Sequence, residues 1–129
     1  MEEERLLLIF LSVGFLLTAL IGAFYPNQPP KANMRVGQKE GNAPLQVTFD
    51  ASGSTDPEGR IVQYKWEFGD DSVDSGVRVN HIYEKSGNYK AVLTVADSRG
   101  ATSTDNVTIS VSEPVKLIEL LNWELVEDA

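Results

Sequence analysis

The stretch WEFGDDS, residues 66–72, joins an alternating apolar run to a glycine and two adjacent aspartates. Trp66 and Phe68 stand two positions apart, as side chains on one face of a strand do, and the residues that follow are typical of a turn. The three carboxylates could instead belong to a calcium loop. Counted from the first aspartate, an EF-hand needs glycine at the sixth position and glutamate at the twelfth, and Ser75 and His81 occupy these positions. The stretch therefore predicts a strand that ends in a turn, and not an EF-hand.

The same period of two recurs on both sides of this stretch, in short runs separated by Gly, Pro, Asn and Asp. The alternating apolar positions are Leu45, Val47, Phe49; Val62, Tyr64, Trp66, Phe68; Tyr89, Ala91, Leu93, Val95; and Val107, Ile109, Val111. No helical pattern separates these runs. They predict an all-β domain in which two antiparallel sheets meet face to face, with Trp66 and Tyr64 providing much of the core.

Composition limits the classes of protein that the chain can belong to. With 129 residues and 42% hydrophobic content, it can support one modest core, and without cysteine it has neither disulfides nor thiolate metal sites. The net charge of -8 argues against nucleic acid and against an anionic membrane surface as partners.

Three short features invite a functional interpretation, and each has a simpler structural explanation. Asp74-Ser75-Gly76 matches the triplet of aspartic proteases, but it falls where a turn is required between two predicted strands. His81 has no serine or cysteine signature beside it, so a packed or turn-bonding role is expected. The segment 56–59, DPEG, has the residues that a type I turn prefers. We therefore predict no catalytic residues.

Three segments together resemble the PKD domain, an immunoglobulin-like sandwich of cell-surface proteins and secreted hydrolases. They are APLQVTFDASGSTDPEGRIVQYKWEFGDDS, HIY and GNYKAVLTVADSRGAT, in order within residues 30–112. Glu67 and Asp71 depart from the family pattern, which has Asp and Gly there, but an aspartate can adopt a left-handed turn conformation. The resemblance implies a PKD/Ig-like antiparallel β-sandwich over residues 32–112, located outside the cytoplasm.

The resemblance also implies a candidate calcium site. Some PKD domains of secreted collagenases bind calcium where the linker that enters the first strand meets the loop at residues 56–59. The matching oxygen donors in this chain are Asn27, Asp56 and Glu58. Calcium needs six to eight oxygen ligands, which this corner could supply only in part. Turn chemistry already explains Asp56, so both interpretations stay open.

An uncharged apolar run precedes the domain. Residues 6–24 would span roughly 28 Å as a helix, close to the thickness of a bilayer core. The chain begins EEER and lacks the basic start of a cleaved signal peptide, so we predict a single-pass anchor at residues 1–24 and a proline-rich linker at 25–31. The small residues Gly14, Thr18 and Gly22 are spaced for close packing against another membrane helix, although such residues are also ordinary in membrane spans.

The distribution of basic residues on its own favours the opposite orientation. Arg5 is the only basic residue before the span, whereas Lys31, Arg35 and Lys39 follow it. That rule applies to short loops, and long segments can be translocated regardless of their charge. The PKD resemblance therefore decides the expected location, which is a cell membrane with the bulk of the chain extracytoplasmic. Asn106-Val107-Thr108 is then a glycosylation sequon on the solvent face of a strand, although a three-residue pattern also arises by chance.

The last segment, 113–129, extends beyond the PKD resemblance. Its pattern favours an amphipathic helix, and a strand stays open as an alternative because several large apolar residues share a two-residue parity. Exposing all of these side chains to water is unfavourable, and the acidic residues among them argue against anionic lipid, so we expect docking on a protein partner. The predicted docking residues are Leu117, Ile118, Leu121, Trp123 and Leu125.

Two functional classes follow from this organisation. The first is an accessory subunit of a membrane or cell-surface assembly, whose anchor and tail contact other protein subunits. The second is a tethered adhesion module that binds glycan or cell-envelope protein and is stabilised by calcium. Both are non-catalytic binding functions, and no cofactor other than calcium is expected.

Overall fold

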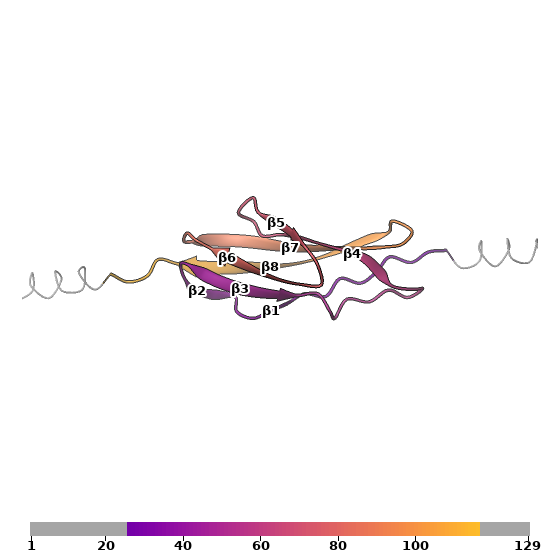
Figure 1. Ribbon diagram of the computed structural model, residues 1–129, viewed down its shortest axis with the longest axis horizontal. Coiled ribbons are helices and arrows are strands. Elements are labelled where there is room, and N and C mark those ends of the chain that lie inside the picture. Colours follow the sequence, from indigo (N-terminus) through magenta and orange to yellow (C-terminus); the bar gives the residue numbers. More distant parts are fainter. Residues whose placement is uncertain (1–25, 117–129) are drawn as a thin grey trace, which may run out of the picture.

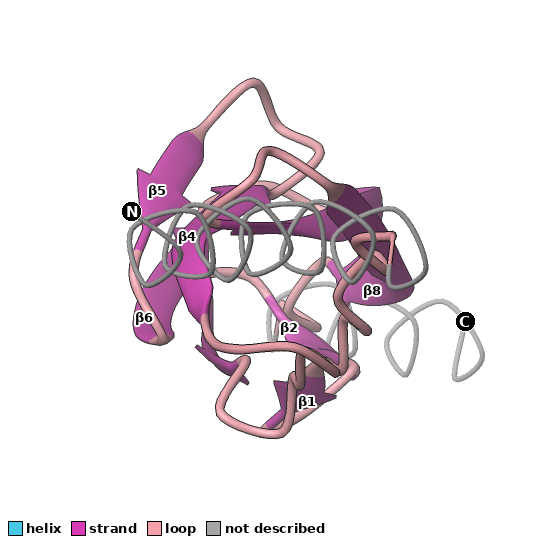
Figure 2. Cartoon of the chain, turned by 90° about the vertical axis from the view of Figure 1, so that its right-hand side faces the viewer, coloured by secondary structure: helices cyan, strands magenta, loops and turns pink. Residues whose placement is uncertain are grey.

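The computed structural model describes residues 26–116, which form a sandwich of two β-sheets (Figure 1). Figure 2 views the same layers along the long axis. The predicted anchor with Gly14, Thr18 and Gly22, and the predicted docking residues from Leu117 to Leu125, lie outside the described residues. Within the described part, no helix is long and apolar enough to cross a membrane.

The three-stranded sheet has the order β1-β3-β6, and the five-stranded sheet has the order β2-β8-β7-β4-β5. The strands are β1 (Arg35–Val36), β2 (Glu40–Asn42), β3 (Leu45–Asp50), β4 (Ile61–Glu67), β5 (Val73–Ser75), β6 (Arg78–Tyr83), β7 (Gly87–Asp97) and β8 (Thr102–Ser112). Strands are predicted correctly at all four alternating runs, and the all-β sandwich is confirmed.

One pairing differs from the expected antiparallel pattern. The chain leaves β1, which pairs with β3, and crosses to the other sheet, where β2 lies parallel to the end of β8. Glu40 lies opposite Ser110 and Asn42 opposite Ser112. The first part of the domain therefore contributes a strand to each sheet. Both strands run in the same direction along the chain, so β1 is antiparallel to β3 and β2 is parallel to β8.

The core lies between the sheets and is built largely from the predicted alternating positions. Trp66, Phe49 and Leu93 have no exposed surface, and burial of each such side chain stabilises the fold by about 2–3 kcal/mol. The prediction is wrong for Val62, which is 57% exposed because the register of β4 against β7 shifts between Ile61 and Gln63. Such a bulge turns a side chain away from the face that simple alternation assigns to it.

A second correction concerns the tyrosines. Tyr64 is only half-buried, whereas Tyr83, which the alternation did not single out, is fully buried. The Tyr83 hydroxyl donates a hydrogen bond to the carbonyl oxygen of Phe68 at 2.9 Å. This bond lets a polar hydroxyl stay in the core and joins the end of β6 to the end of β4.

The stretch WEFGDDS forms the expected strand and turn. Phe68 N–H donates to the Ser72 carbonyl at 3.0 Å, and the Asp70 carboxylate accepts the Ser72 N–H at 3.1 Å. Gly69 has a φ of 85° and Asp71 a φ of 68°, so the predicted left-handed aspartate is confirmed. The N–H groups of Phe68 and Ser72 are thus both hydrogen-bonded within the turn.

Gly69 provides the first prediction. A Cβ at this position would lie 2.7 Å from the Lys90 carbonyl oxygen and 2.8 Å from its nitrogen, both in the backbone of β7. Gly100 has a similar φ of 87° and nothing within 4 Å of the equivalent Cβ. Gly100→Ala should therefore cost only the left-handed strain, about 1–2 kcal/mol, whereas Gly69→Ala should cost about 1–3 kcal/mol more. Thermal melts of both variants measure this difference, and equal melting temperatures would contradict the close approach of the turn to β7.

Candidate functional site

The turn after β4 is tied to β6 by a buried polar and aromatic cluster. His81 Nε2 lies 2.7 Å from Asp70 Oδ2, and the imidazole stacks on Phe68 with ring centroids 4.0 Å apart. The Tyr83 ring meets the imidazole edge-on at 4.7 Å. His81 thus has the packed, turn-bonding role expected from the sequence.

Electrostatics in this cluster favour a charged Asp70. Burial alone would raise the pKa of the Asp70 carboxyl, but hydrogen bonds from His81 and from Ser72 outweigh burial and lower it. Burial, together with the Asp70 charge, raises the pKa of Tyr83 well above its usual range. The raised pKa agrees with the role of the Tyr83 hydroxyl as a hydrogen-bond donor to the Phe68 carbonyl. The cluster therefore holds the turn after β4 against β6.

A second polar cluster joins the linker to the far end of β7. Asn27 Nδ2 donates to Asp97 Oδ2 at 2.7 Å, and Asp97 Oδ1 accepts the N–H groups of Arg99 and Ala101 at 2.8 and 2.9 Å. Asp97 is only 5% exposed, and it is the one charged side chain buried within residues 26–116. The hydrogen bond from Asn27, followed by those from the backbone, lowers the pKa of this carboxyl against the opposing effect of burial.

The linker also runs beside the turn at residues 56–59. Lys31 and Thr55 exchange two backbone hydrogen bonds, of 2.7 and 3.0 Å, and both oxygens of the Glu58 carboxylate accept the Gln28 N–H at 3.0 Å. Asp56 Oδ1 accepts the Glu58 N–H at 3.1 Å, as a turn-capping aspartate should.

The three residues of the predicted calcium site therefore lie along this contact between linker and turn. Asn27 is bonded to Asp97, and Glu58 is bonded to the linker backbone. Asp56 Oδ2 is buried and has no hydrogen-bond partner within the described part of the chain. Residues 26–116 contain no group of three or more His, Cys, Asp or Glu side chains that could hold a metal. The donors are of the oxygen type that calcium prefers, but the carboxylates alone are too few.

The aspartic-protease triplet has a structural role. Asp74 and Ser75 lie in the exposed strand β5, and the Asp74 carboxylate accepts the Ser75 N–H at 2.8 Å. The carbonyl oxygen of Gly76 accepts a hydrogen bond from Trp66 Nε1 at 2.8 Å. The triplet therefore closes the edge of a sheet.

Asn106, in the sequon, lies on the exposed side of β8, opposite Val92 of β7. The expected solvent-facing position is correct. Glycosylation of Asn106 stays a prediction.

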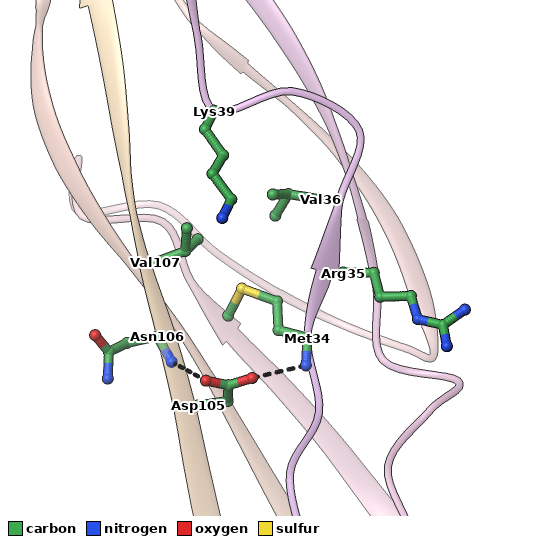
Figure 3. Close-up of a pocket in the computed structure, with 7 residues that line it drawn as sticks. All are labelled: Met34, Arg35, Val36, Lys39, Asp105, Asn106 and Val107. Carbon is green, nitrogen blue, oxygen red and sulfur yellow. Dashed lines mark hydrogen bonds between the residues drawn. The ribbon is translucent and has the colours of Figure 1, made fainter.

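A cleft that no sequence pattern predicted lies between β1 and β8, and we refer to it as the β1–β8 cleft (Figure 3). Its volume is about 550 Å³, and its lining residues are Met34, Arg35, Val36, Lys39, Asp105, Asn106 and Val107. Asp105 accepts the N–H groups of Met34 and Asn106, both at 2.8 Å. The two walls are about 70 residues apart in sequence, so no local motif could have revealed the cleft.

Two packed sheets with a buried tryptophan on a central strand define an immunoglobulin-like β-sandwich. The model of the PKD domain family matches residues 27–111, and the chain belongs to this family. PKD domains are in general non-catalytic modules, and the described residues are consistent with that class.

Several relatives of the chain are much larger proteins named as collagenases. It is 36% identical over 87 residues to "Collagenase ColQ1" of Bacillus cereus (strain Q1), an alignment covering 67% of this chain and 9% of that protein. It is 37% identical to "Microbial collagenase" of Vibrio alginolyticus, with 67% and 10% covered. The chain thus spans about a tenth of the length of these relatives.

Solved structures agree on the fold. The PKD1 domain of Vibrio anguillarum Epp is 34% identical, with a TM-score of 0.60, and the match covers 69% of this chain and 100% of that one. A structure described as one of "carbohydrate-binding modules from the beta-sandwich super family" is 33% identical with a TM-score of 0.67, covering 70% of this chain and 37% of that one.

The Asp97 cluster predicts how stability depends on pH. Because the folded state lowers the pKa of Asp97, this carboxylate stabilises the fold above its unfolded pKa of about 3.9, and the stabilisation is lost as the pH falls through the folded value. Asp97→Asn should lower the melting temperature at pH 7 by several degrees and flatten its decline below about pH 4. Asp74→Asn, on the exposed edge strand, is the matched control and should leave the profile of melting temperature against pH nearly unchanged. An Asp97→Asn profile parallel to that of the wild type would contradict the assigned role of Asp97.

Proposed function

We propose that the chain is a non-catalytic, membrane-anchored PKD module that lies outside the cytoplasm and mediates protein–protein contacts, as an accessory subunit of a membrane or cell-surface assembly. Its membership in the PKD family supports a binding module. The anchor, the location and the partner are inferred from the sequence on either side of the domain.

The observation that carries this proposal is the geometry of the two junctions. Residue 26 enters at one end of the long axis, and residues 113–116 leave at the opposite end (Figure 1). A module attached to a membrane through residues 6–24 would therefore present the apolar segment 117–129 about one domain length from the bilayer. This position suits contact with another protein better than contact with lipid.

The entry junction favours an assembly subunit over a loosely tethered module. Asn27 is bonded to Asp97, Gln28 to Glu58 and Lys31 to Thr55, so the linker is held against the sandwich soon after the predicted span. A short, bonded linker fixes the orientation of the domain relative to an anchor, which helps a subunit in a defined complex. An adhesion module gains from a long flexible tether instead.

The second candidate is adhesion to glycan or cell-envelope protein. Its support is the likeness to the structure described as a carbohydrate-binding module, of which the chain covers 37%. Within residues 26–116, however, the large apolar side chains that are exposed are valines and one isoleucine, none of them aromatic. An exposed aromatic side chain, with a flat apolar face and a polar edge, is the usual platform for stacking on a ring. The glycan alternative is therefore the weaker one.

Calcium at the junction of linker and turn is a further element of the proposal. The buried, unpartnered Asp56 Oδ2 supports it, since a cation would supply the missing interaction. Asn27 could contribute its amide oxygen while its nitrogen stays bonded to Asp97, and backbone carbonyls and water would complete the shell.

Calcium should therefore raise the melting temperature of the full chain in detergent, because a ligand that binds only the folded state stabilises it. Asp56→Asn keeps the Oδ1 acceptor for the Glu58 N–H and removes the charge on Oδ2, so it should abolish the calcium-dependent increase. Glu67→Gln, an exposed change on β4, is the control with the same loss of charge. No stabilisation and no titration heat at millimolar calcium would exclude the site.

The accessory-subunit proposal predicts separate roles for anchor and tail. Replacement of residues 6–24 by a generic leucine span should reduce co-purification of partners in mild detergent, since the small-residue pairs would be lost. Deletion of residues 117–129 should also reduce co-purification while leaving the melting temperature of the domain unchanged.

Two outcomes would contradict this proposal. If the deletion lowers the melting temperature by several degrees, the tail belongs to the core of its own sandwich and not to a partner. If both variants retain every partner, the chain acts as an independent tethered module.

A further inference from the structure

The β1–β8 cleft combines an apolar floor with a basic side chain. Met34, Val36 and Val107 line the floor, and Lys39 extends toward the space between them (Figure 3). The Arg35 side chain lies on the other side of β1 and points away from this space. Neither Lys39 nor Arg35 forms an ion pair within residues 26–116. The one acidic lining residue, Asp105, is already bonded to two backbone N–H groups. The cleft therefore suits a segment that carries both apolar and acidic side chains.

One wall of the cleft is an unpaired strand edge. β2 pairs with β8 only over Ser110–Ser112, and upstream of this range no strand formed by residues 26–116 lies on that side of β8. Since the Ser110 N–H points to that side and donates to the Lys39 carbonyl at 2.8 Å, strand alternation directs the N–H and C=O groups of Thr108 to the same side. From Lys31 to Met34 the chain contacts β8 through the Ser103 and Asp105 side chains instead of a backbone ladder. An extended peptide could add to this open edge.

The chain itself contains a segment with the required chemistry. Residues 117–129, LIELLNWELVEDA, hold four carboxylates, no basic residue and most of the apolar side chains that follow the domain. They account for a charge of -4 out of the total of -8. The described domain, with ten basic and twelve acidic side chains, has a net charge of only -2. The acidic charge and the apolar side chains of residues 117–129 thus both complement the cleft.

The length of chain favours the tail of a neighbouring molecule over that of the same one. The cleft lies beside Val107, about 17 Å back along β8 from Ser112, and residues 113–116 continue about 13 Å beyond the strand. A return over roughly 30 Å would consume about nine of the thirteen residues in 117–129 and would have to pass β2. The tail of a second copy does not have to fold back in this way, so all of residues 117–129 are available for the contact.

We propose that the β1–β8 cleft binds residues 117–129 of a second copy of this chain, as an extended segment added to the edge of β8. A carboxylate of the segment pairs with Lys39, and alternate apolar side chains cover Met34, Val36 and Val107. This inference deepens the proposed function and rests on it for the use of the tail as a contact segment. Each copy both gives and receives a tail, so the contact closes as a reciprocal dimer or continues as a row of anchored molecules.

The absence of cysteine from the chain allows a clean crosslinking test. Full-length chains carrying Asn106→Cys, at the cleft, are mixed in detergent with differently tagged chains carrying one cysteine in the tail, at each of positions 119 to 125 in turn. Mild oxidation should give disulfide-linked heterodimers, with yields that alternate with a period of two along the tail. Ser75→Cys on β5, equally exposed and far from the cleft, is the matched control and should give none.

A binding measurement tests the charges independently. A labelled peptide of residues 113–129 should bind the chain that lacks residues 117–129, and Lys39→Glu should weaken this binding about three- to tenfold, as expected for an exposed charge pair. Arg60→Glu, the same charge reversal at an exposed site in the turn before β4, should leave the affinity unchanged. Added salt should weaken the binding of the peptide to the wild-type cleft.

Three results would overturn the inference. The first is a disulfide yield from the cysteine at position 75 that equals the yield from position 106. The second is a set of yields that vary along the tail with the period of a helix. The third is a peptide affinity that Lys39→Glu leaves unchanged. The proposed function is tested by a different experiment, because it concerns the partners that co-purify from native membranes. If deletion of the tail still removes those partners while no copies crosslink, the cleft inference is wrong and the accessory function stands.

Discussion

The burial of Trp66 is the constraint on which the rest of this sandwich depends. Its indole ring has no exposed surface and meets Phe49 of the opposite sheet with ring centroids 5.5 Å apart. A buried indole N–H must be satisfied, and it donates to the Gly76 carbonyl at the point where the chain passes from β5 to β6. One side chain therefore holds the two sheets together and also fixes the crossover between them.

The same arrangement determines the turn after β4. Because Trp66 and Phe68 both point into the core, the chain must reverse immediately after Phe68, against the backbone of Lys90 on β7. Only a glycine fits at that approach. The Asp70 carboxylate then closes the turn by accepting the Ser72 N–H, and Asp71 adopts the left-handed backbone conformation. The Tyr83 hydroxyl and the pair of His81 and Asp70 then attach β6 to this turn. The two aspartates of WEFGDDS thus each have a role in the turn.

Strand alternation was sufficient to predict the class of fold, since the side chains that it places inward are those that the sandwich buries. It was wrong at Val62 because a bulge is a property of the pairing between β4 and β7, which the sequence of β4 alone does not contain. Tyr83 was missed because its burial depends on a carbonyl acceptor 15 residues away. The parallel pairing of β2 was missed because three polar residues, Glu40 to Asn42, carry no strand pattern of their own. The β1–β8 cleft could not be predicted either, because its walls come together only through the tertiary fold.

The cleft follows from how the chain enters the domain. A strand that pairs with β3 cannot also pair with β8, so the chain crosses between the sheets at Gly37 to Lys39, and the edge of β8 is left without a partner strand next to the crossing. Asp105 caps one N–H group of this edge, that of Asn106, and also holds the Met34 N–H of the segment before β1. Such capping is one protection against unwanted strand pairing. The protection is incomplete, because apolar side chains and Lys39, which has no ion pair within residues 26–116, lie directly beside the edge. In the proposed contact, Lys39 would favour an acidic segment over an uncharged or basic one, and this selectivity would limit general aggregation through the sheet edge.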